Sequence, residues 1–379
     1  MHERLMEFLV CPQCRGELKL HALALTSGQQ DEVETGLLRC GAAHVYPIVR
    51  GIPRMLPDSI AEYAGAFQEC RFQMNAILPA EEIERLARSG RKVRYDRRTK
   101  QNFSLEWQSF KTAEGTWTMT PEDQVQSYLV NPLRSVDAMD VIGDGALLFD
   151  AGCGPGLPSL GYAELGFEVI ALDLSTGLEH GERVRRERPQ HVRGRVHFVQ
   201  GDLFNPPIRF GIADIVSSLG VISSTPSTKD GFDSIARVLK QDAVFSVWVY
   251  SHEPGVTELV NTLRVVTTRI PSPLFAGIAT AAAPAFQAFC WFADKTGLRP
   301  YGRLSRGAAR IALMDIFGAP FVHSHTFEEV DGWFREHGFA RAAKVAVSRR
   351  GFGAIGVRGA LTRVEAVFPP AAVRERARA

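Results

Sequence analysis

The amino-acid sequence predicts an α/β fold, in which helices cover both faces of a mostly parallel sheet and a small metal-binding unit precedes it. Five short apolar runs alternate with helical patterns between residues 147 and 250, which is typical of parallel strands joined by helical crossovers. Three of the six cysteines fall within the first 40 residues. Such crowding favours a metal site over a disulfide framework spread along a secreted chain.

Length and composition set the scale of the fold. At roughly 100–200 residues per domain, a chain of 379 residues predicts two domains. A hydrophobic content of 45% with 23% charged residues is ordinary for a packed protein. Forty-four basic against 42 acidic residues leave a net charge of only +2, which argues against a protein whose main task is to coat nucleic acid. A local basic patch stays open.

The first residues and the cysteines together predict the compartment. The segment 1–6 is polar and lacks an apolar run ending in small residues, so we expect no signal peptide. With its cysteines crowded at the front, the chain is expected in a reducing cytoplasm. Thirty-six arginines against 8 lysines are typical of the coding bias of a GC-rich bacterial genome.

Residues 1–58 are predicted to form a zinc-binding unit. Two residues separate Cys11 from Cys14, and after a gap of 25 residues Cys40 and His44 form a C-x3-H pattern. Three thiolates and one imidazole satisfy tetrahedral zinc, and each close pair can bind from one turn. Four protein ligands leave no open position, so we expect a structural zinc ion that supplies folding energy to a unit too small for a large core. The alternative is three unrelated buried cysteines.

Residues 59–140 are predicted to be a helical connector or cap. Residues 79–88 have the period of an amphipathic helix with a proline in its first turn. Phe103 and Trp107 lie at helical spacing, which usually indicates core packing and here could also form a wall for a ligand.

A basic cluster lies between residues 85 and 100. An RNA-binding protein could use it to contact phosphates, and the alternative is a solvated basic face or a contact to a small anion. Its members are Arg85, Arg88, Arg91, Lys92, Arg94, Arg97, Arg98 and Lys100.

Residues 141–361 are predicted to be the sheet domain. Helical patterns at 157–165 and 229–240 separate its apolar runs. The five runs expected as strands are 147–150, 169–173, 196–200, 213–218 and 243–250.

A long insertion at 253–322 follows the fifth strand. Thr326 then opens a helix with a capping box. Two closing strands, near 341–347 and 353–358, complete the sheet, and residues 362–379 are expected as a flexible tail.

The loop after the first strand carries the main functional signal. Three glycines between residues 152 and 156 let the backbone turn tightly and approach a ligand where a Cβ would clash. Asp173 ends the next strand, 23 residues after Asp150, where a carboxylate can accept both hydroxyls of a ribose. Asp202 ends the third strand, where an adenine amino group would need an acceptor. A Rossmann-like core for another nucleotide stays open at this point.

These motifs resemble those of class I S-adenosylmethionine-dependent methyltransferases. In Asp150-Ala-Gly-Cys-Gly-Pro-Gly156 the acid stands at the strand end, ahead of the glycines, unlike the GxGxxG of a nicotinamide enzyme. The resemblance covers about 141–251 and 326–359 and implies a Rossmann-like, seven-stranded methyltransferase sheet. Residues 1–58 resemble the zinc-ribbon family typified by the small activator subunit of tRNA methyltransferases, through Cys11-Pro-Gln-Cys14 and Gly51-Ile-Pro-Arg-Met-Leu56.

The resemblance implies where S-adenosylmethionine would bind. The loop would line the methionine and ribose, Asp173 would hold the ribose, and Asp202 would hold the adenine. The complete implied set is Asp150, Gly152, Gly154, Gly156, Asp173, Leu174, Asp202, Leu203, Ser218 and Leu219. Cys153 is expected as a small packed residue, because nothing near it in the sequence suggests an activating base.

Candidate catalytic residues follow from the strand order. The ends of the fourth and fifth strands line the reaction pocket in this fold, which nominates Tyr250 and His252, and His325 just before the capped helix is a further candidate. A base matters where the acceptor is a hydroxyl, because methyl transfer from a sulfonium otherwise depends on alignment. For each histidine the alternative is a packing or solvent role.

Residues 270–293 of the insertion carry no charge. Their number would suffice for a bilayer span of about 20 residues, but prolines and alanines lower the hydrophobicity, so no membrane span is expected. We expect a buried helical hairpin or a lid over an apolar pocket, with a membrane-touching surface as the alternative. Self-association as a homodimer is also left open.

The sequence therefore predicts an S-adenosylmethionine-dependent methyltransferase acting on a small molecule, with a hydroxyl of a secondary metabolite, sugar or lipid-like compound as the first choice. One alternative is an RNA methyltransferase that uses the zinc ribbon and the basic cluster 85–100. Another is a non-catalytic protein that binds a partner. Near-neutral charge and the apolar insertion favour the small molecule, because RNA binding normally needs many positive contacts.

Overall fold

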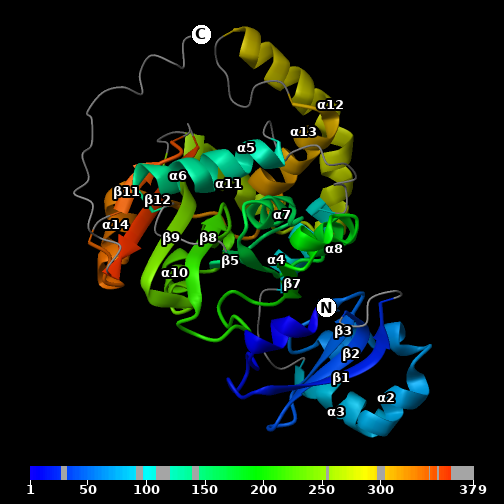
Figure 1. Ribbon diagram of the computed structural model, residues 1–379. Coiled ribbons are helices and arrows are strands. Elements are labelled where there is room, and N and C mark those ends of the chain that lie inside the picture. The colour runs from blue at the N-terminus through cyan, green and yellow to red at the C-terminus, as the bar shows by residue number, and fades with distance from the viewer. Residues whose placement is uncertain are drawn as a thin grey trace.

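The computed structural model describes residues 1–26, 32–90, 97–107, 120–138, 145–252, 256–296, 304–340, 342–347 and 350–359. A small antiparallel sheet lies at the N-terminal end, and a large mostly parallel sheet follows it (Figure 1). The expected tail 362–379 and three members of the basic cluster, Arg91, Lys92 and Arg94, lie outside the described residues.

The N-terminal unit is a sheet in the order β1-β2-β3-β4, with antiparallel neighbours. Every residue of β3 is buried, whereas β1 has only half-buried and exposed residues, as suits an edge strand. The turn from β2 to β3 closes with a hydrogen bond from Cys40 N to His44 O of 3.1 Å. The elements are η1 Glu3–Glu7, β1 Leu18–Leu25, β2 Val33–Cys40, β3 Val45–Val49 and β4 Ile52–Pro53.

The large sheet has the order β11-β12-β9-β8-β5-β6-β7, and β10 pairs with β9 beside this path. Strands β9, β8, β5, β6 and β7 are parallel to one another, whereas β12 is antiparallel to β9 and β11. The seven-strand path confirms the predicted fold class, and β10 is an addition that the sequence did not indicate. The bounds are β5 Leu147–Ala151, β6 Glu168–Asp173, β7 Val196–Gln200, β8 Ala213–Leu219, β9 Leu239–Ser251, β10 Ser324–His325, β11 Ala342–Val345 and β12 Gly351–Arg358.

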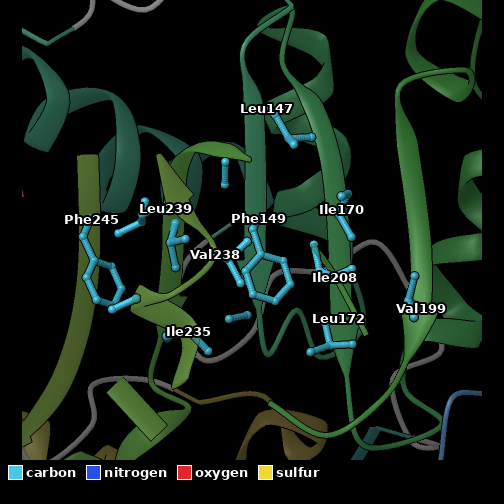
Figure 2. Close-up of a cluster of buried hydrophobic side chains, with 14 of the residues drawn as sticks. Leu147, Phe149, Ile170, Leu172, Val199, Ile208, Ile235, Val238, Leu239 and Phe245 are labelled. Carbon is cyan, nitrogen blue, oxygen red and sulfur yellow. The ribbon is translucent and has the colours of Figure 1, made fainter. Parts of the chain in front are cut away.

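Helices cover both faces of this sheet. On one face, Phe232 of α10 and Phe334 of α14 pack against Phe245 of β9, with ring centroids 4.5 and 5.5 Å away. Figure 2 shows the same side of the sheet, where Phe149 and Leu172 point into a buried cluster. The helices α5 (Pro121–Val125), α6 (Asn131–Ser135) and α7 (Leu157–Glu164) contribute to the cluster on the opposite face. The helices of this region are α7 Leu157–Glu164, α8 Leu178–Arg186, α9 Gln190–Arg193, η4 Ile222–Ser224, α10 Thr228–Ala236 and α14 Phe327–Glu336.

The helices between the two sheets divide into two groups. The first group packs on the N-terminal unit, where Phe67, Leu78 and Leu86 join Leu37 and Val45 in one buried cluster. The second group packs on the large sheet and on the insertion, because α4 contacts α12 and η5, and α5 contacts α7. The first comprises α1 Ser59–Glu62, η2 Ala64–Phe67, α2 Arg71–Ile77 and α3 Ala80–Gly90, and the second α4 Arg97–Trp107, α5 Pro121–Val125, the π-helical turn η3 Gln126–Val130 and α6 Asn131–Ser135.

The insertion after β9 is helical, as expected, but it is not a buried hairpin. Helix α12 Ser272–Lys295 is the one helix in the described part of the chain that is long and apolar enough to cross a membrane, and only 28% of its most apolar 18-residue window is buried. Leu274, Phe289 and Phe292 are more than half exposed, and α12 lies along the outer edge of the molecule (Figure 1). The other elements are α11 Val256–Thr267, α13 Arg306–Leu313 and the π-helical turn η5 Met314–Gly318.

The N-terminal unit and the large sheet share a hydrophobic core. Leu9, Tyr46 and Met55 belong to the same buried cluster as Phe149 and Leu172. The backbone also joins the two units: Val10 N donates to Pro207 O at 2.9 Å, and Met55 N donates to Gln200 O at 2.7 Å. The contact therefore falls on the end of β7 and on the segment that follows Asp202.

Candidate active site

The glycine loop between β5 and α7 has the strained backbone that its sequence indicates. Gly152, Gly154 and Gly156 have φ angles of +95°, +55° and +74°, a region that residues with a Cβ rarely adopt. A Cβ on Gly152 would lie 2.3 Å from a methyl group of Val221, and one on Gly156 would lie 2.3 Å from the ring of Phe198. The loop thus forms a cradle of bare backbone that a ligand can approach closely.

Asp173 fastens this loop to the end of β6. Its Oδ2 accepts a hydrogen bond of 2.8 Å from Gly154 N, and its Oδ1 accepts bonds of 2.7 and 2.6 Å from the backbone N and Oγ of Ser175. Each carboxylate oxygen has more than one acceptor site, so the group can still receive hydroxyls from a bound ribose. Asp150 is buried beside it and accepts 2.6 Å from Ser159 Oγ, and burial raises the pKa of Asp150 to about 7.

A cavity of about 960 Å³ begins at this loop. Eight of the ten residues predicted to bind the cofactor line it: Asp150, Gly152, Gly154, Asp173, Leu174, Asp202, Leu203 and Leu219. Gly156 is packed against Phe198, and Ser218 donates a hydrogen bond of 2.9 Å to Ala151 O, so these two support the loop from behind. Cys153 also lines the cavity, and burial raises the pKa of its thiol, which disfavours the nucleophilic thiolate.

The four predicted zinc ligands meet in the N-terminal unit. One ligand atom each of Cys11, Cys14, Cys40 and His44 lies within 4.8 Å of the other three, for example 3.3 Å between Cys40 Sγ and His44 Nδ1. A tetrahedral ion with bonds of about 2.3 Å needs ligand atoms roughly 3.8 Å apart, so the set fits zinc. Tyr46 OH lies 3.2 Å from Cys11 Sγ and helps to orient it.

Comparisons with known families agree with both sites. A family described as "Methyltransferase domain" matches residues 149–247, which contain the glycine loop, Asp173 and Asp202. Residues 149–247 are a methyltransferase domain. A family described as "Trm112p-like protein" matches residues 2–51, which contain all four predicted zinc ligands. The methyltransferase domain makes S-adenosylmethionine the cofactor that the glycine loop would hold.

Individual relatives are distant. The chain is 37% identical over 65 residues to a magnesium-protoporphyrin O-methyltransferase of Rhodobacter capsulatus, which is 17% of this chain and 28% of that protein. The chain thus matches little more than a quarter of that curated relative. The structure of magnesium protoporphyrin IX methyltransferase from Synechocystis is 17% identical with a TM-score of 0.39, and covers 69% of this chain and 98% of its own. A Haloferax volcanii complex of the Trm112 methyltransferase activator and a methyltransferase gives 12% identity, a TM-score of 0.39, and coverage of 70% and 99%.

The far end of the cavity of the methyltransferase domain carries polar groups. Tyr250, at the end of β9, donates a hydrogen bond of 3.0 Å to Asp315 Oδ2. Asp315 comes from the π-helical turn η5, and burial raises the pKa of its carboxyl to about 6. Arg264 holds this turn through bonds of 2.7 and 2.6 Å to the carbonyls of Ile316 and Ala319. Single π-helical turns of this kind occur often at functional sites.

Helix α4 closes the cavity from the side of the cofactor loop. Trp107 packs against Gly154 and Gly177, where an added Cβ would lie 3.3 and 2.7 Å from its ring. Glu106 precedes it, is only 2% exposed, and also lines the cavity. Sequence reasoning missed Glu106 and Asp315 as site residues. The one sequence signal near Glu106 was the helical spacing of Phe103 and Trp107 in α4. No sequence signal indicated Asp315 in η5.

The three predicted catalytic residues lie in different places. Tyr250 lines the cavity, whereas His252 and His325 are not among the residues that line it. His252 lies 3.3 Å from Glu258 Oε1 and is about half exposed. His325 hydrogen-bonds with Glu329 Oε2 at 3.0 Å and Thr228 Oγ1 at 2.9 Å. Tyr250 is therefore the one predicted catalytic residue that lines the cavity.

Described members of the basic cluster are largely paired within the protein. Arg85 lies 3.3 Å from Glu82, Arg97 lies 3.1 Å from Asp58, and Lys100 contacts Glu62. Arg98 donates to Ile270 O at 2.9 Å. These pairs neutralise much of the positive charge that a phosphate backbone would need.

Proposed function

We propose that the protein transfers a methyl group from S-adenosylmethionine to a small-molecule acceptor, with a hydroxyl as the accepting group. The observation that carries this proposal is the cavity, which runs without interruption from the glycine loop to Tyr250 and Asp315 and has room for a cofactor and an acceptor. Ligand pockets typically measure about 300–1,000 Å³, and this one is about 960 Å³.

The residues of the loop would hold the cofactor in the order that the family resemblance implies. Asp150, Gly152 and Gly154 would line its methionine and ribose. Asp173 would accept from the ribose hydroxyls, and Asp202 with Leu203 would hold the adenine. When bound, S-adenosylmethionine supplies a methyl carbon on a positively charged sulfur. The protein contributes alignment, which is worth roughly 7–11 kcal/mol in well-oriented reactions.

The walls of the cavity favour an acceptor with a large apolar part. Trp107, Trp248, Phe103 and Leu304 line it, and aromatic walls stabilise flat or lipophilic molecules through contact area. The polar groups gather at Tyr250 and Asp315, so we infer that the hydroxyl enters there. Secondary metabolites and lipid-like compounds have this combination, and a sugar would need an apolar substituent.

We also infer that the Trm112p-like domain serves the methyltransferase domain of its own chain. Arg54 is fully buried, and it donates hydrogen bonds of 3.3 Å to Gln200 and 2.8 Å to Glu179 in the methyltransferase half. Gln200 directly precedes Gly201 and Asp202, so the zinc-binding unit supports the adenine end of the cavity. Because the Trm112p-like family matches, RNA remains the second candidate acceptor. The pairing of the basic cluster within the protein argues against RNA.

The proposal is tested by titration calorimetry with S-adenosylmethionine. Asp173→Asn keeps the size of the side chain and loses the charge. Because a hydrogen bond to a charged group is worth about 1.5–3 kcal/mol, the variant is expected to bind at least tenfold more weakly. Asp242→Asn, an exposed position on β9, is the matched control and should bind as the unaltered protein does. Normal binding by Asp173→Asn would refute the cofactor site.

The acceptor is tested separately. Incubation of the protein and S-adenosylmethionine with a metabolite extract should yield a product 14 mass units heavier, found by mass spectrometry, on a lipophilic hydroxyl compound. Gel shift with total RNA at two salt concentrations is expected to show no micromolar complex. A salt-sensitive shift together with methylated RNA would favour the RNA alternative.

A further inference from the structure

Glu106 is a buried acid that lines the cavity and that the cofactor site does not use. It lies near the end of α4, is 2% exposed, and lines the cavity next to Trp107, which packs on the glycine loop. Its Oε2 has no hydrogen-bond partner among the described residues. A buried carboxylate oxygen without a partner is costly and is rarely retained unless a ligand uses it.

Charged groups surround Glu106 from four elements. Asp315 of η5 and Asp173 of β6 repel a negative charge on it, and Arg310 of α13 attracts one. Tyr250 of β9 is the fourth group within electrostatic reach. The guanidinium of Arg310 donates elsewhere, to Thr280 Oγ1 at 2.9 Å and to the carbonyl oxygens of Leu105 and Glu106 at 3.2 and 3.5 Å. Burial and the neighbouring carboxylates therefore raise the pKa of Glu106 well above its ordinary value.

We propose that Glu106 is the general base that takes the proton from the acceptor hydroxyl, a role that rests on the proposed methyl transfer. Asp315 is less suited to this role, because both of its carboxylate oxygens lie within 3.3 Å of Tyr250 OH. The pair of Asp315 and Tyr250 instead positions the acceptor. Glu106 lines the shared cavity, and its Oε2 has no competing donor among the described residues.

The proton and the electrons balance in this step. The acceptor oxygen forms a bond to the methyl carbon while its O–H bond breaks and the proton moves to the carboxylate of Glu106. The electron pair of the breaking carbon–sulfur bond stays on sulfur, which becomes a neutral thioether. The sulfonium charge and the carboxylate charge disappear together, so a low-dielectric site favours the products. The neutral carboxyl later returns its proton to water.

The same arrangement predicts a proton that is released when the cofactor binds. The raised pKa means that Glu106 in the ligand-free cavity keeps its proton to a higher pH than an ordinary carboxyl group does. A sulfonium in the cavity lowers that pKa, so S-adenosylmethionine should displace the proton. S-adenosylhomocysteine carries the same amino acid and nucleoside but no sulfonium charge. The difference between the two ligands therefore isolates groups that sense the reacting sulfur.

The experiment is titration calorimetry of both ligands at pH 6.5 in two buffers of different ionisation enthalpy, which gives the number of protons released. The unaltered protein should release more protons with S-adenosylmethionine than with S-adenosylhomocysteine, by up to about one. Glu106→Gln should lose at least half of that difference while binding S-adenosylhomocysteine normally, which also shows that it is folded. Glu84→Gln, with its exposed side chain on α3, is the matched control and should behave as the unaltered protein.

Kinetics give a second reading. With a hydroxyl acceptor found in the extract, Glu106→Gln should lower kcat by about 10²–10⁴-fold and remove the acidic limb of the pH profile. An equal proton release for the two ligands, or a difference that survives in Glu106→Gln, would overturn the role of Glu106 and leave methyl transfer standing. Absence of S-adenosylmethionine binding by the unaltered protein would overturn both proposals.

Discussion

Arg185 offers the most direct test of how the two units hold together. It lies on α8, is 2% exposed, and uses its whole guanidinium. Nη1 and Nη2 donate to Glu32 of the N-terminal unit at 3.2 and 2.9 Å, and Nε and Nη2 donate to Glu182 at 2.7 and 2.9 Å. Nη1 also donates to Arg193 O at 2.8 Å. Replacing it by leucine would leave two buried carboxylates poorly compensated.

The expected magnitude follows from this burial. Removing one partner of a buried ion pair costs about 3–5 kcal/mol, because the remaining charge stays desolvated, whereas an exposed pair is worth about 0–1 kcal/mol. Arg188→Leu is therefore the matched control, since Arg188 pairs at 3.3 Å with Glu164 and both side chains are more than 40% exposed. We expect Arg185→Leu to lower the free energy of unfolding by about 3 kcal/mol more than Arg188→Leu does.

Two probes can follow the two units separately in urea. All five tryptophans lie outside residues 1–58, so their fluorescence reports on the methyltransferase half, and a chromophoric chelator reports zinc release from the N-terminal unit. In Arg185→Leu we expect zinc release at a lower urea concentration than the loss of tryptophan signal. Equal midpoints for the two arginine variants would refute the reasoning.

The pH dependence provides a further check on the same network. Burial alone would raise the pKa of Glu32, but hydrogen bonding and attraction by Arg185 lower it overall. A depressed folded-state pKa stabilises the protein above the ordinary carboxyl range and loses that contribution as the pH falls. The difference between Arg185→Leu and the unaltered protein should therefore shrink on acidification below about pH 4.

Two other perturbations give clear expectations. Gly152→Ala should weaken S-adenosylmethionine binding at least tenfold in calorimetry, because φ is +95° and the new Cβ would lie 2.3 Å from Val221. Gly332→Ala, in open space on α14, is the control and should bind normally. Equal affinities of the two variants would contradict the proposed backbone cradle. Cys40→Ser should abolish stoichiometric zinc binding in elemental analysis. It should also shift the unfolding of the N-terminal unit to lower urea concentration, since metal binding supplies much of the folding energy of small zinc domains. Cys70→Ser, away from the cluster, is the control and should keep the metal.

Local sequence patterns predicted much of the fold and the cofactor end of the site. The apolar runs of β5 to β9 and the N-cap residue Thr326 are local signals that packing did not override. Thr326 Oγ1 accepts a hydrogen bond of 3.2 Å from Glu329 N, which is one half of the predicted capping box. The glycine loop and Asp173 were found for the same reason, because a turn and a strand end fix their places. The cysteine spacing predicted its cluster because each pair of ligands is close in the sequence.

The acceptor end could not be found in this way, because tertiary packing assembles it. Glu106 and Asp315 are 209 residues apart in the sequence and stand in ordinary helical contexts. They become electrostatic neighbours because α4 packs on η5 and α12. The exposed face of α12 was mispredicted for the opposite reason. The uncharged run 270–293 normally indicates burial, whereas here α4, α13 and η5 cover only one side of the helix. Residues that act on a bound acceptor are thus fixed by helix packing around the cavity, and a local motif search finds only those that hold the cofactor.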